Sequence, residues 1–199
     1  MISHKHKCIF IHIPKTAGTS IESALGGWGL TQDNEHKLLG DVYQSQHHTL
    51  QSIEKTLRQK YFKFTFVRNP WDRFVSLYFY YKGGGNQKSD IHLKKYIPLD
   101  FKSFVTQPLD TIIPRSHLES QFSYLEESGK IELDFIGRFE RLEDDYKYIR
   151  TKFGLDQKLS ITRKSIHKHY TEYYDDETRQ IVADKYAKDI EYFRYKFGE

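Results

Sequence analysis

Apolar residues gather in three short runs, each ended by polar or turn-forming residues. The runs are KCIFIHI at 7–13, YFKFTFV at 61–67 and IELDFIGRF at 131–139. The first run stops at Pro14 and the second at an Asn-Pro pair, and both signals commonly end a strand. Apolar and β-branched runs of this length are typical of buried strands, so the pattern predicts three of them.

Between these runs, apolar residues recur every three or four positions, which predicts helices with one buried face. The predicted helices begin near residue 19, cover 49–61, 71–82 and 142–154, and run from Asp176 towards Phe197. Thr19 or Ser20 fits as the N-cap of the first helix, and Gly154 closes the fourth. Strands that alternate with helices predict an α/β fold with a mostly parallel sheet.

The composition favours a packed globular protein of one domain, residues 1–199. Aromatic residues make up 16% of the chain, and 31 Lys and Arg against 27 Asp and Glu give a formal charge of +4. This mild excess suits an anionic ligand and does not call for nucleic acid. The single Cys8 excludes an internal disulfide and a cysteine-based zinc site. The histidines of "HKHK" near the start are better explained as a solvated arm than as a metal site.

No stretch approaches the roughly 18–20 apolar residues that a membrane helix needs. The charged start of the chain is followed by a short apolar run that His12 interrupts, without a small-residue cleavage site. The sequence therefore predicts a soluble, cytoplasmic protein without signal peptide or membrane anchor. No feature of the sequence indicates an oligomeric state.

A lysine, a glycine and three hydroxyl groups follow the first predicted strand within residues 14–20. Ligands of open α/β sheets bind beyond the carboxyl ends of strands, where helix N-termini attract anions. Lys15 adds a full charge, and Gly18 lets the backbone approach the anion closely. The hydroxyl donors are Thr16, Thr19 and Ser20. The stretch predicts a site for phosphate or a similar group; an ordinary strand–turn–helix junction is the alternative.

This loop differs from the common nucleotide-binding loop, in which the lysine follows the glycines. The second strand end repeats the anion theme, because Arg68 follows the strand and Ser76 lies on the next helix. Arginine binds phosphate with two parallel hydrogen bonds. A salt bridge from Arg68 to Asp72, with Ser76 as a packed small residue, is the alternative.

The two segments HIPKTAGTS and FVRNPWDRFVSLY resemble the 5′-phosphosulfate and 3′-phosphate segments of sulfotransferases that use 3′-phosphoadenosine-5′-phosphosulfate (PAPS). DFIGRFERLEDDY and the C-terminal helical stretch are similar to later parts of the same family, so the resemblance covers about residues 8–197. Within this family, the motifs resemble those of carbohydrate sulfotransferases of the heparan-sulfate 2-O and chondroitin 4-O type and their bacterial relatives. The resemblance implies a P-loop-like, three-layer fold with helices on both sides of the sheet.

The resemblance also implies the donor-binding residues and the product, adenosine 3′,5′-bisphosphate. The 5′ group would be bound by Lys15, Thr16, Ala17, Gly18, Thr19 and Ser20, and the 3′-phosphate by Arg68 and Ser76. Lys164 and Ser165 match a further loop that contacts the donor, although Arg163 stands where relatives often have Asn. Sulfuryl transfer depends on positioning and charge stabilisation, and this scheme requires no metal.

Transfer to a sugar hydroxyl needs a general base, and histidine is the usual choice near neutral pH. Relatives often carry Lys-His-x-Thr before the second strand, which aligns His47 as the base, with His48 one residue out of register. A pair of surface histidines beside a helix is the alternative. His12, within the first strand, is interpreted as structural.

The segment PRSHLESQFSYL resembles a part of the family near the acceptor. His117 and Gln121 are four residues apart and would share a helix face, with Arg115 beside them. A plain amphipathic helix fits the same pattern.

The sequence therefore predicts a PAPS-dependent sulfotransferase that acts on a carbohydrate hydroxyl. A P-loop kinase or NTPase is the second possibility, disfavoured because Lys15 precedes the glycine and no acidic strand end for Mg²⁺ is evident. A protein that binds the nucleotide without catalysis is the third. The identity of the acceptor lies beyond the sequence.

Overall fold

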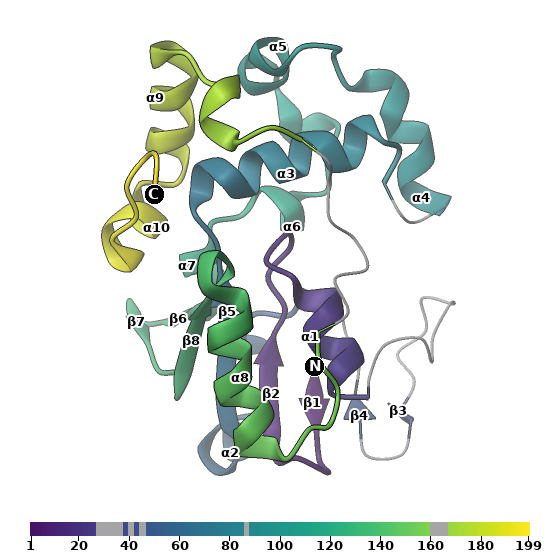
Figure 1. Ribbon diagram of the computed structural model, residues 1–199, viewed down its shortest axis with the longest axis vertical. Coiled ribbons are helices and arrows are strands. Elements are labelled where there is room, and N and C mark those ends of the chain that lie inside the picture. Colours follow the sequence, from purple (N-terminus) through teal and green to yellow (C-terminus); the bar gives the residue numbers. More distant parts are fainter. Residues whose placement is uncertain (27–37, 40–41, 44–46, 86–87, 160–166) are drawn as a thin grey trace. The chain divides into compact units, whose positions relative to one another are not determined.

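The computed structural model describes residues 1–26, 38–39, 42–43, 47–85, 88–159 and 167–199 (Figure 1). The chain divides into two compact units. The first unit consists of Met1–Val67 and Gln121–Thr162, and the second of Arg68–Ser120 and Arg163–Glu199. Each unit has its own hydrophobic core.

The first unit is built on a sheet with the strand order β3-β4-β1-β2-β5-β8. The strands are β1 (Ile2–Ser3), β2 (Cys8–Ile11), β3 (Leu38–Leu39), β4 (Val42–Tyr43), β5 (Phe62–Val67) and β8 (Phe135–Arg138). The three longest strands, β2, β5 and β8, run parallel, and the two-residue strands pair antiparallel at one edge. All three predicted strands are therefore present. The third is shorter than predicted, because Lys130–Ile131 (β7) pairs instead with Glu126–Glu127 (β6).

Two helices cover one face of this sheet: α1 (Gly18–Ala24) and α8 (Leu142–Phe153). Strand residues alternate in direction, and one set packs with the helices in a single buried cluster. That cluster contains Cys8, Phe10, Phe64 and Phe66 from the strands, Ile21, Ala24 and Leu25 from and just after α1, and Tyr146 and Ile149 from α8. Gly154, at φ 61°, ends α8 as predicted.

Residues 49–61 do not form the single helix that the spacing predicts. They form a 3₁₀ turn, η1 (Leu50–Ser52), and a separate helix, α2 (Lys55–Lys60). Ser52 turns its hydroxyl back to the Thr49 carbonyl oxygen at 2.7 Å, and Ile53 adopts an extended backbone. Both the hydroxyl bond and the extended residue interrupt the helical hydrogen-bond series.

The second unit is helical and is organised around α3 (Pro70–Lys82), as predicted. The aromatic side chains of α3 pack against most other elements of the unit, and the Tyr80 hydroxyl donates to the Asp90 carboxylate on α4 (Lys88–Ile91). The remaining elements are η2 (His92–Tyr96), α5 (Phe101–Thr106), η3 (Leu109–Thr111), α6 (Arg115–Leu118), η5 (Tyr170–Tyr173), α9 (Asp176–Lys185) and α10 (Ala187–Phe193). The predicted C-terminal helix is thus two helices that meet at Tyr186. This residue is buried and donates its hydroxyl to the Leu118 carbonyl oxygen at 3.1 Å.

Asn69 connects the start of α3 to the C-terminal part of the second unit. Its side-chain oxygen caps α3 by accepting from the Trp71 amide at 3.2 Å. Its amide nitrogen donates to the Lys196 carbonyl oxygen at 2.9 Å and to the Tyr170 hydroxyl at 3.3 Å. The side chain is fully buried, so these groups have no water to replace a lost partner.

We predict that Asn69→Ala lowers the free energy of unfolding by about 2–4 kcal/mol, the sum of a lost cap and lost buried hydrogen bonds. Urea unfolding measures the change. Asp100→Ala is the control, because Asp100 caps α5 at the surface by accepting from the Ser103 amide. An equal loss in both variants would show that the amide contacts of Asn69 contribute nothing.

Candidate functional site

The turn between β2 and α1 has an unusual backbone. Lys15 and Ala17 both have φ near 70°, a left-handed conformation that residues other than glycine rarely adopt. Ala17 is the N-cap of α1 and provides no side-chain cap, so the prediction that Thr19 or Ser20 caps this helix is wrong. The chain turns two residues earlier than the cap pattern indicates, and both hydroxyl residues lie within α1.

The side chains of this turn lie at different depths. Thr16 is fully buried and donates its hydroxyl to the Ile13 carbonyl oxygen at 2.9 Å, which holds the turn to the segment that follows β2. Ser20 is buried, whereas Lys15 and Thr19 are half-buried. A half-buried lysine can present its ammonium group to an anion while its stem packs against the turn.

Beneath the turn lies a buried polar pair, His12 and Glu22. His12 Nδ1 lies 3.1 Å from Glu22 Oε1, and both side chains are almost completely excluded from solvent. Neither atom has a well-aligned hydrogen bond within the described residues, so the contact is mainly electrostatic. Burial by itself raises the pKa of the Glu22 carboxyl and is the largest single influence, but the adjacent His12 and the N-terminal ammonium group together hold this pKa below its usual value.

The two candidate bases face different surroundings, as expected for neighbouring residues. His47 has φ 64° and donates from Nδ1 to the His12 carbonyl oxygen at 3.3 Å. Its ring meets the His12 ring edge-on, with centroids 5.0 Å apart. A carbonyl oxygen can only accept, so the proton of the neutral imidazole lies on Nδ1 and the lone pair on Nε2.

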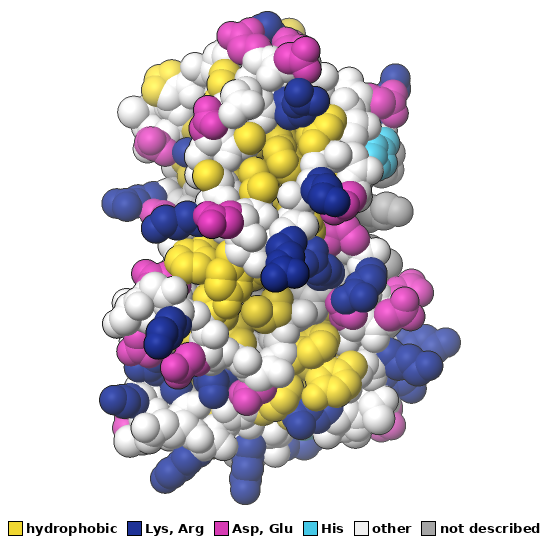
Figure 2. Space-filling view, turned by 90° about the vertical axis from the view of Figure 1, so that its left-hand side faces the viewer, with side chains coloured by type: hydrophobic (Ala, Val, Ile, Leu, Met, Phe, Trp, Pro, Cys, Tyr) yellow, Lys and Arg dark blue, Asp and Glu magenta, His cyan; other side chains and the backbone are white. Residues whose placement is uncertain are grey.

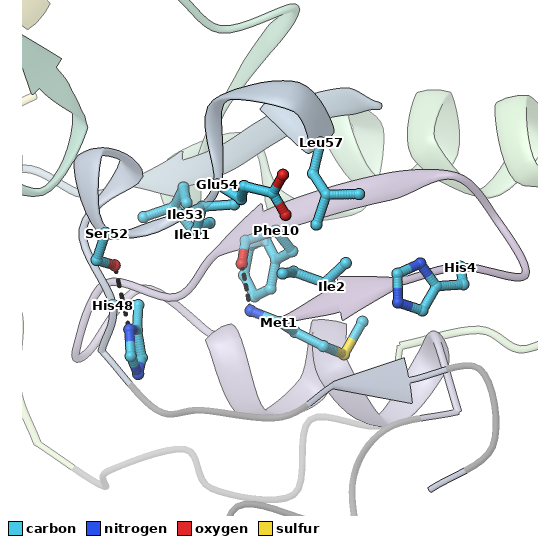
Figure 3. A pocket seen from close by; sticks show the side chains of 10 residues that line it. All are labelled: Met1, Ile2, His4, Phe10, Ile11, His48, Ser52, Ile53, Glu54 and Leu57. Atoms are coloured by element: carbon cyan, nitrogen blue, oxygen red, sulfur yellow. Dashed lines mark hydrogen bonds between the residues drawn. The ribbon is translucent and has the colours of Figure 1, made fainter. Parts of the chain in front are cut away.

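His48 instead lines a pocket of about 310 Å³ between β1–β2 and the segment that carries η1 and α2 (Figure 3). Its Nδ1 lies 3.1 Å from the Ser52 hydroxyl. That hydroxyl already donates to the Thr49 carbonyl oxygen, so it accepts from His48. Most of the remaining wall is apolar, with His4 and Glu54 as further polar residues. His47 is not among the lining residues of this pocket.

Arg68 begins the second unit and makes the salt bridge considered above. Its Nε donates to Asp72 Oδ2 at 2.8 Å, one helical turn further along, and the arginine is nearly buried. Ser76, one turn beyond Asp72 on α3, is also nearly buried. The ion pair uses one of the five N–H donors of the guanidinium and fixes its orientation.

The three residues expected beside the acceptor do not share a helix face. α6 ends at Leu118 and α7 (Gln121–Leu125) begins three residues later, with extended backbone at Glu119 between them. His117 receives a 2.6 Å contact from the Tyr81 hydroxyl, whereas Gln121 is fully buried in the first unit. Arg115 is exposed and pairs with Glu119 at 2.6 Å. The prediction that His117 and Gln121 share a helix face was wrong, because it assumed one unbroken helix over both residues.

Other expectations concern the whole chain. Lys164 and Ser165 lie outside the described residues. Within the described ranges, no three His, Cys, Asp or Glu side chains gather as metal ligands do. Nor does any helix in those ranges have the length and apolar character needed to cross a membrane. On the face shown in Figure 2, Lys and Arg are interspersed with Asp and Glu, in keeping with the small net charge.

The family profile described as "Sulfotransferase family" matches residues 1–196, which span both units. Carbohydrate sulfotransferase 11 of Rattus norvegicus is 24% identical over 193 residues, covering 81% of this chain and 54% of that protein. Carbohydrate sulfotransferase 14 of Danio rerio is 24% identical over 229 residues, covering 98% and 61%. An uncharacterized protein of Archaeoglobus fulgidus is 32% identical over 111 residues, covering 55% and 81%.

The chain therefore spans little more than half the length of the carbohydrate sulfotransferases that it matches. Among solved structures, mouse sulfotransferase SULT7A1 complexed with PAP aligns with a TM-score of 0.59 at 13% identity, covering 94% of this chain and 86% of that one. This likeness confirms the predicted P-loop-like fold with a mostly parallel central sheet flanked by helices. The family predicted from the two long motifs is also confirmed.

Proposed function

This chain belongs to the sulfotransferase family, and we propose from this that it transfers a sulfuryl group from PAPS to a hydroxyl group of a carbohydrate. The observation that carries the proposal is the turn after β2, where Lys15 stands at the head of a strained turn that opens α1. The similarity to carbohydrate sulfotransferases 11 and 14 supports a carbohydrate acceptor.

In the proposed reaction, the donor supplies an activated sulfuryl group and leaves as adenosine 3′,5′-bisphosphate. Lys15 balances the negative charge that develops on the bridging oxygen as the sulfur–oxygen bond breaks. Thr16, Ala17, Gly18, Thr19 and Ser20 complete the turn around the 5′ group. The Thr16 hydroxyl donates to the Ile13 carbonyl oxygen within the turn, which supports a mainly structural role for this hydroxyl.

His47 is the proposed general base. Its Nδ1–H bond to the His12 carbonyl oxygen supports this role, because the tautomer leaves the lone pair on Nε2, where a hydroxyl proton can be accepted. The same tautomer follows for His48 from its bond to Ser52, so the tautomer alone does not choose between them. The contact of His47 with His12, which directly precedes the turn, favours His47.

Arg68 and Ser76 are proposed to bind the 3′-phosphate. Asp72 orients the Arg68 guanidinium through Nε, and the terminal nitrogens of a guanidinium are suited to bind two phosphate oxygens in parallel. The salt bridge and the phosphate contact are therefore compatible.

Lys164 and Ser165 are kept as proposed donor contacts, and Arg115, His117 and Gln121 as proposed acceptor contacts. A single domain over residues 1–199 and a cytoplasmic location also remain proposals.

A P-loop kinase or NTPase is the competing function. Isothermal calorimetry separates the two, because adenosine 3′,5′-bisphosphate should bind without Mg²⁺ and ATP should compete poorly. Tight binding of ATP that depends on Mg²⁺ would favour the kinase or NTPase instead. Transfer of a labelled sulfuryl group from PAPS to a panel of sugars, polysaccharides, lipids and phenols then identifies the acceptor.

Lys15→Met should lower turnover by about tenfold or more, equal to about 1.4 kcal/mol of transition-state stabilisation, because it removes the charge and keeps the length of the side chain. Turnover with the best acceptor is compared with wild type. Lys5→Met is the matched control, since Lys5 is exposed and lies before β2. A smaller loss in Lys15→Met, or an equal one in the control, would exclude Lys15 from the reaction.

His47→Ala should lower turnover by about 10²–10⁴ and change donor affinity little, because a general base acts mainly in the transition state. His48→Ala should lower turnover much less. Wild-type turnover should also fall at acidic pH, since a protonated imidazole accepts no proton. If only His48→Ala is inactive, His48 is the base; if both variants are active, His117 is the next candidate.

Arg68→Ala should weaken the binding of adenosine 3′,5′-bisphosphate by about 10- to 150-fold, because a charged hydrogen bond contributes about 1.5–3 kcal/mol. Adenosine 5′-phosphate, which lacks the 3′-phosphate, should lose much less affinity. Calorimetry with both ligands provides the comparison within one variant. Equal weakening would assign Arg68 a purely structural role through Asp72.

A further inference from the structure

His12 and Glu22 form a buried titratable pair that the proposed reaction does not use. His12 is 6% exposed and follows the end of β2, while Glu22 is fully buried on α1. The two residues therefore connect the strand before the turn to the helix after it, across residues 13–17. Two buried polar groups are costly in an apolar environment unless they pair with each other, which argues that this contact has a specific use.

The His12 ring also packs directly against the turn. A Cβ added to Gly18 would lie 2.0 Å from His12 Cδ2 and 2.2 Å from Nε2, well inside the contact limit. The ring thus occupies the space that a side chain at residue 18 would fill. Gly18 is needed here for close packing against the imidazole, in addition to any approach of the backbone to an anion.

Three residues around His12 have left-handed backbones: Lys15, Ala17 and His47. None is a glycine, and a conformation of this kind costs about 1–3 kcal/mol unless the surrounding structure determines it. His12 contacts two of the segments involved. Its ring packs on Gly18, next to Ala17, and its carbonyl oxygen accepts from His47 Nδ1.

We propose that the His12–Glu22 pair is a positioning element that holds the turn at 13–18 and the His47 imidazole in one fixed arrangement. Its value for the reaction rests on the function proposed above. Neither residue contacts the reacting atoms in this proposal; both act through Lys15 and His47. The direction of the Glu22 pKa agrees, because the carboxylate is retained beside His12 despite burial.

Glu22→Gln tests this proposal, because it keeps the size of the side chain and removes the charge. His12→Asn is the second variant; it retains a donor close to the position of Nδ1 and removes the ring that packs on Gly18. Tyr146→Phe is the matched control. It deletes the hydroxyl that donates to the Gln157 carbonyl oxygen at 2.9 Å in the same core.

Amide hydrogen exchange of the ligand-free protein is measured first, at a temperature where every variant is folded. Glu22→Gln and His12→Asn should exchange about tenfold or more faster than wild type over residues 13–18 and 47–48, and Tyr146→Phe should match wild type there. Unchanged exchange in both variants overturns the proposal, whatever the activity. If Glu22→Gln does not fold, Glu22→Asp, which withdraws the carboxylate by one methylene, takes its place.

Donor affinity and turnover are measured second. If the wild-type protein transfers sulfuryl groups, both variants should bind adenosine 3′,5′-bisphosphate about tenfold more weakly than wild type. Their turnover should also be about tenfold slower. Wild-type affinity and turnover in variants with faster exchange would overturn the positioning role. A wild-type protein that neither binds the bisphosphate nor transfers would overturn the proposed function, and hydrogen exchange alone would then decide whether the pair orders the turn.

Discussion

The parallel pairing of β2 with β5 is the constraint on which the first unit depends. Ile11 lies opposite Thr65, and the Thr65 hydroxyl donates to the Ile11 carbonyl oxygen at 2.8 Å in the buried interior. Because parallel strands end at the same edge of a sheet, this register determines where the chain leaves β2 for the strained turn and where β5 ends at Val67. The pairing of β5 with β8 extends the same edge.

Elements with a continuous local pattern could be predicted from the sequence. α3 and α8 have apolar residues at helical spacing over about three turns, and their ends carry an Asn-Pro start and a terminal glycine. The break between α9 and α10 has no such local signal. Tyr186 divides the C-terminal helices while its hydroxyl bonds to Leu118, 68 residues away.

The candidate site likewise contains some residues that the sequence indicates and others that only the structure reveals. Lys15, Gly18 and Arg68 could be named as candidates from the sequence, because their residue types and places after a strand are typical of anion sites. The left-handed backbone of Ala17 could not, since alanine is no signal for positive φ. His12 and Glu22 were missed as a pair because they are ten residues apart, and only the turn between them brings a strand residue beside a helix residue. A histidine two positions before Pro14, with an acidic residue inside the next helix, is the signal that could have found them.

The position of Cys8 has a consequence for how this protein can be studied in solution. Its thiol lies in the core beneath α1 and α8, is fully shielded from solvent, and burial raises its pKa to about 12. A thiol reagent requires the exposed thiolate, so it can react with the native protein only after the core of the first unit opens. Since the chain contains a single cysteine, the rate of alkylation in native buffer measures how fast that core opens. The measurement needs no introduced label and reports on the first unit alone.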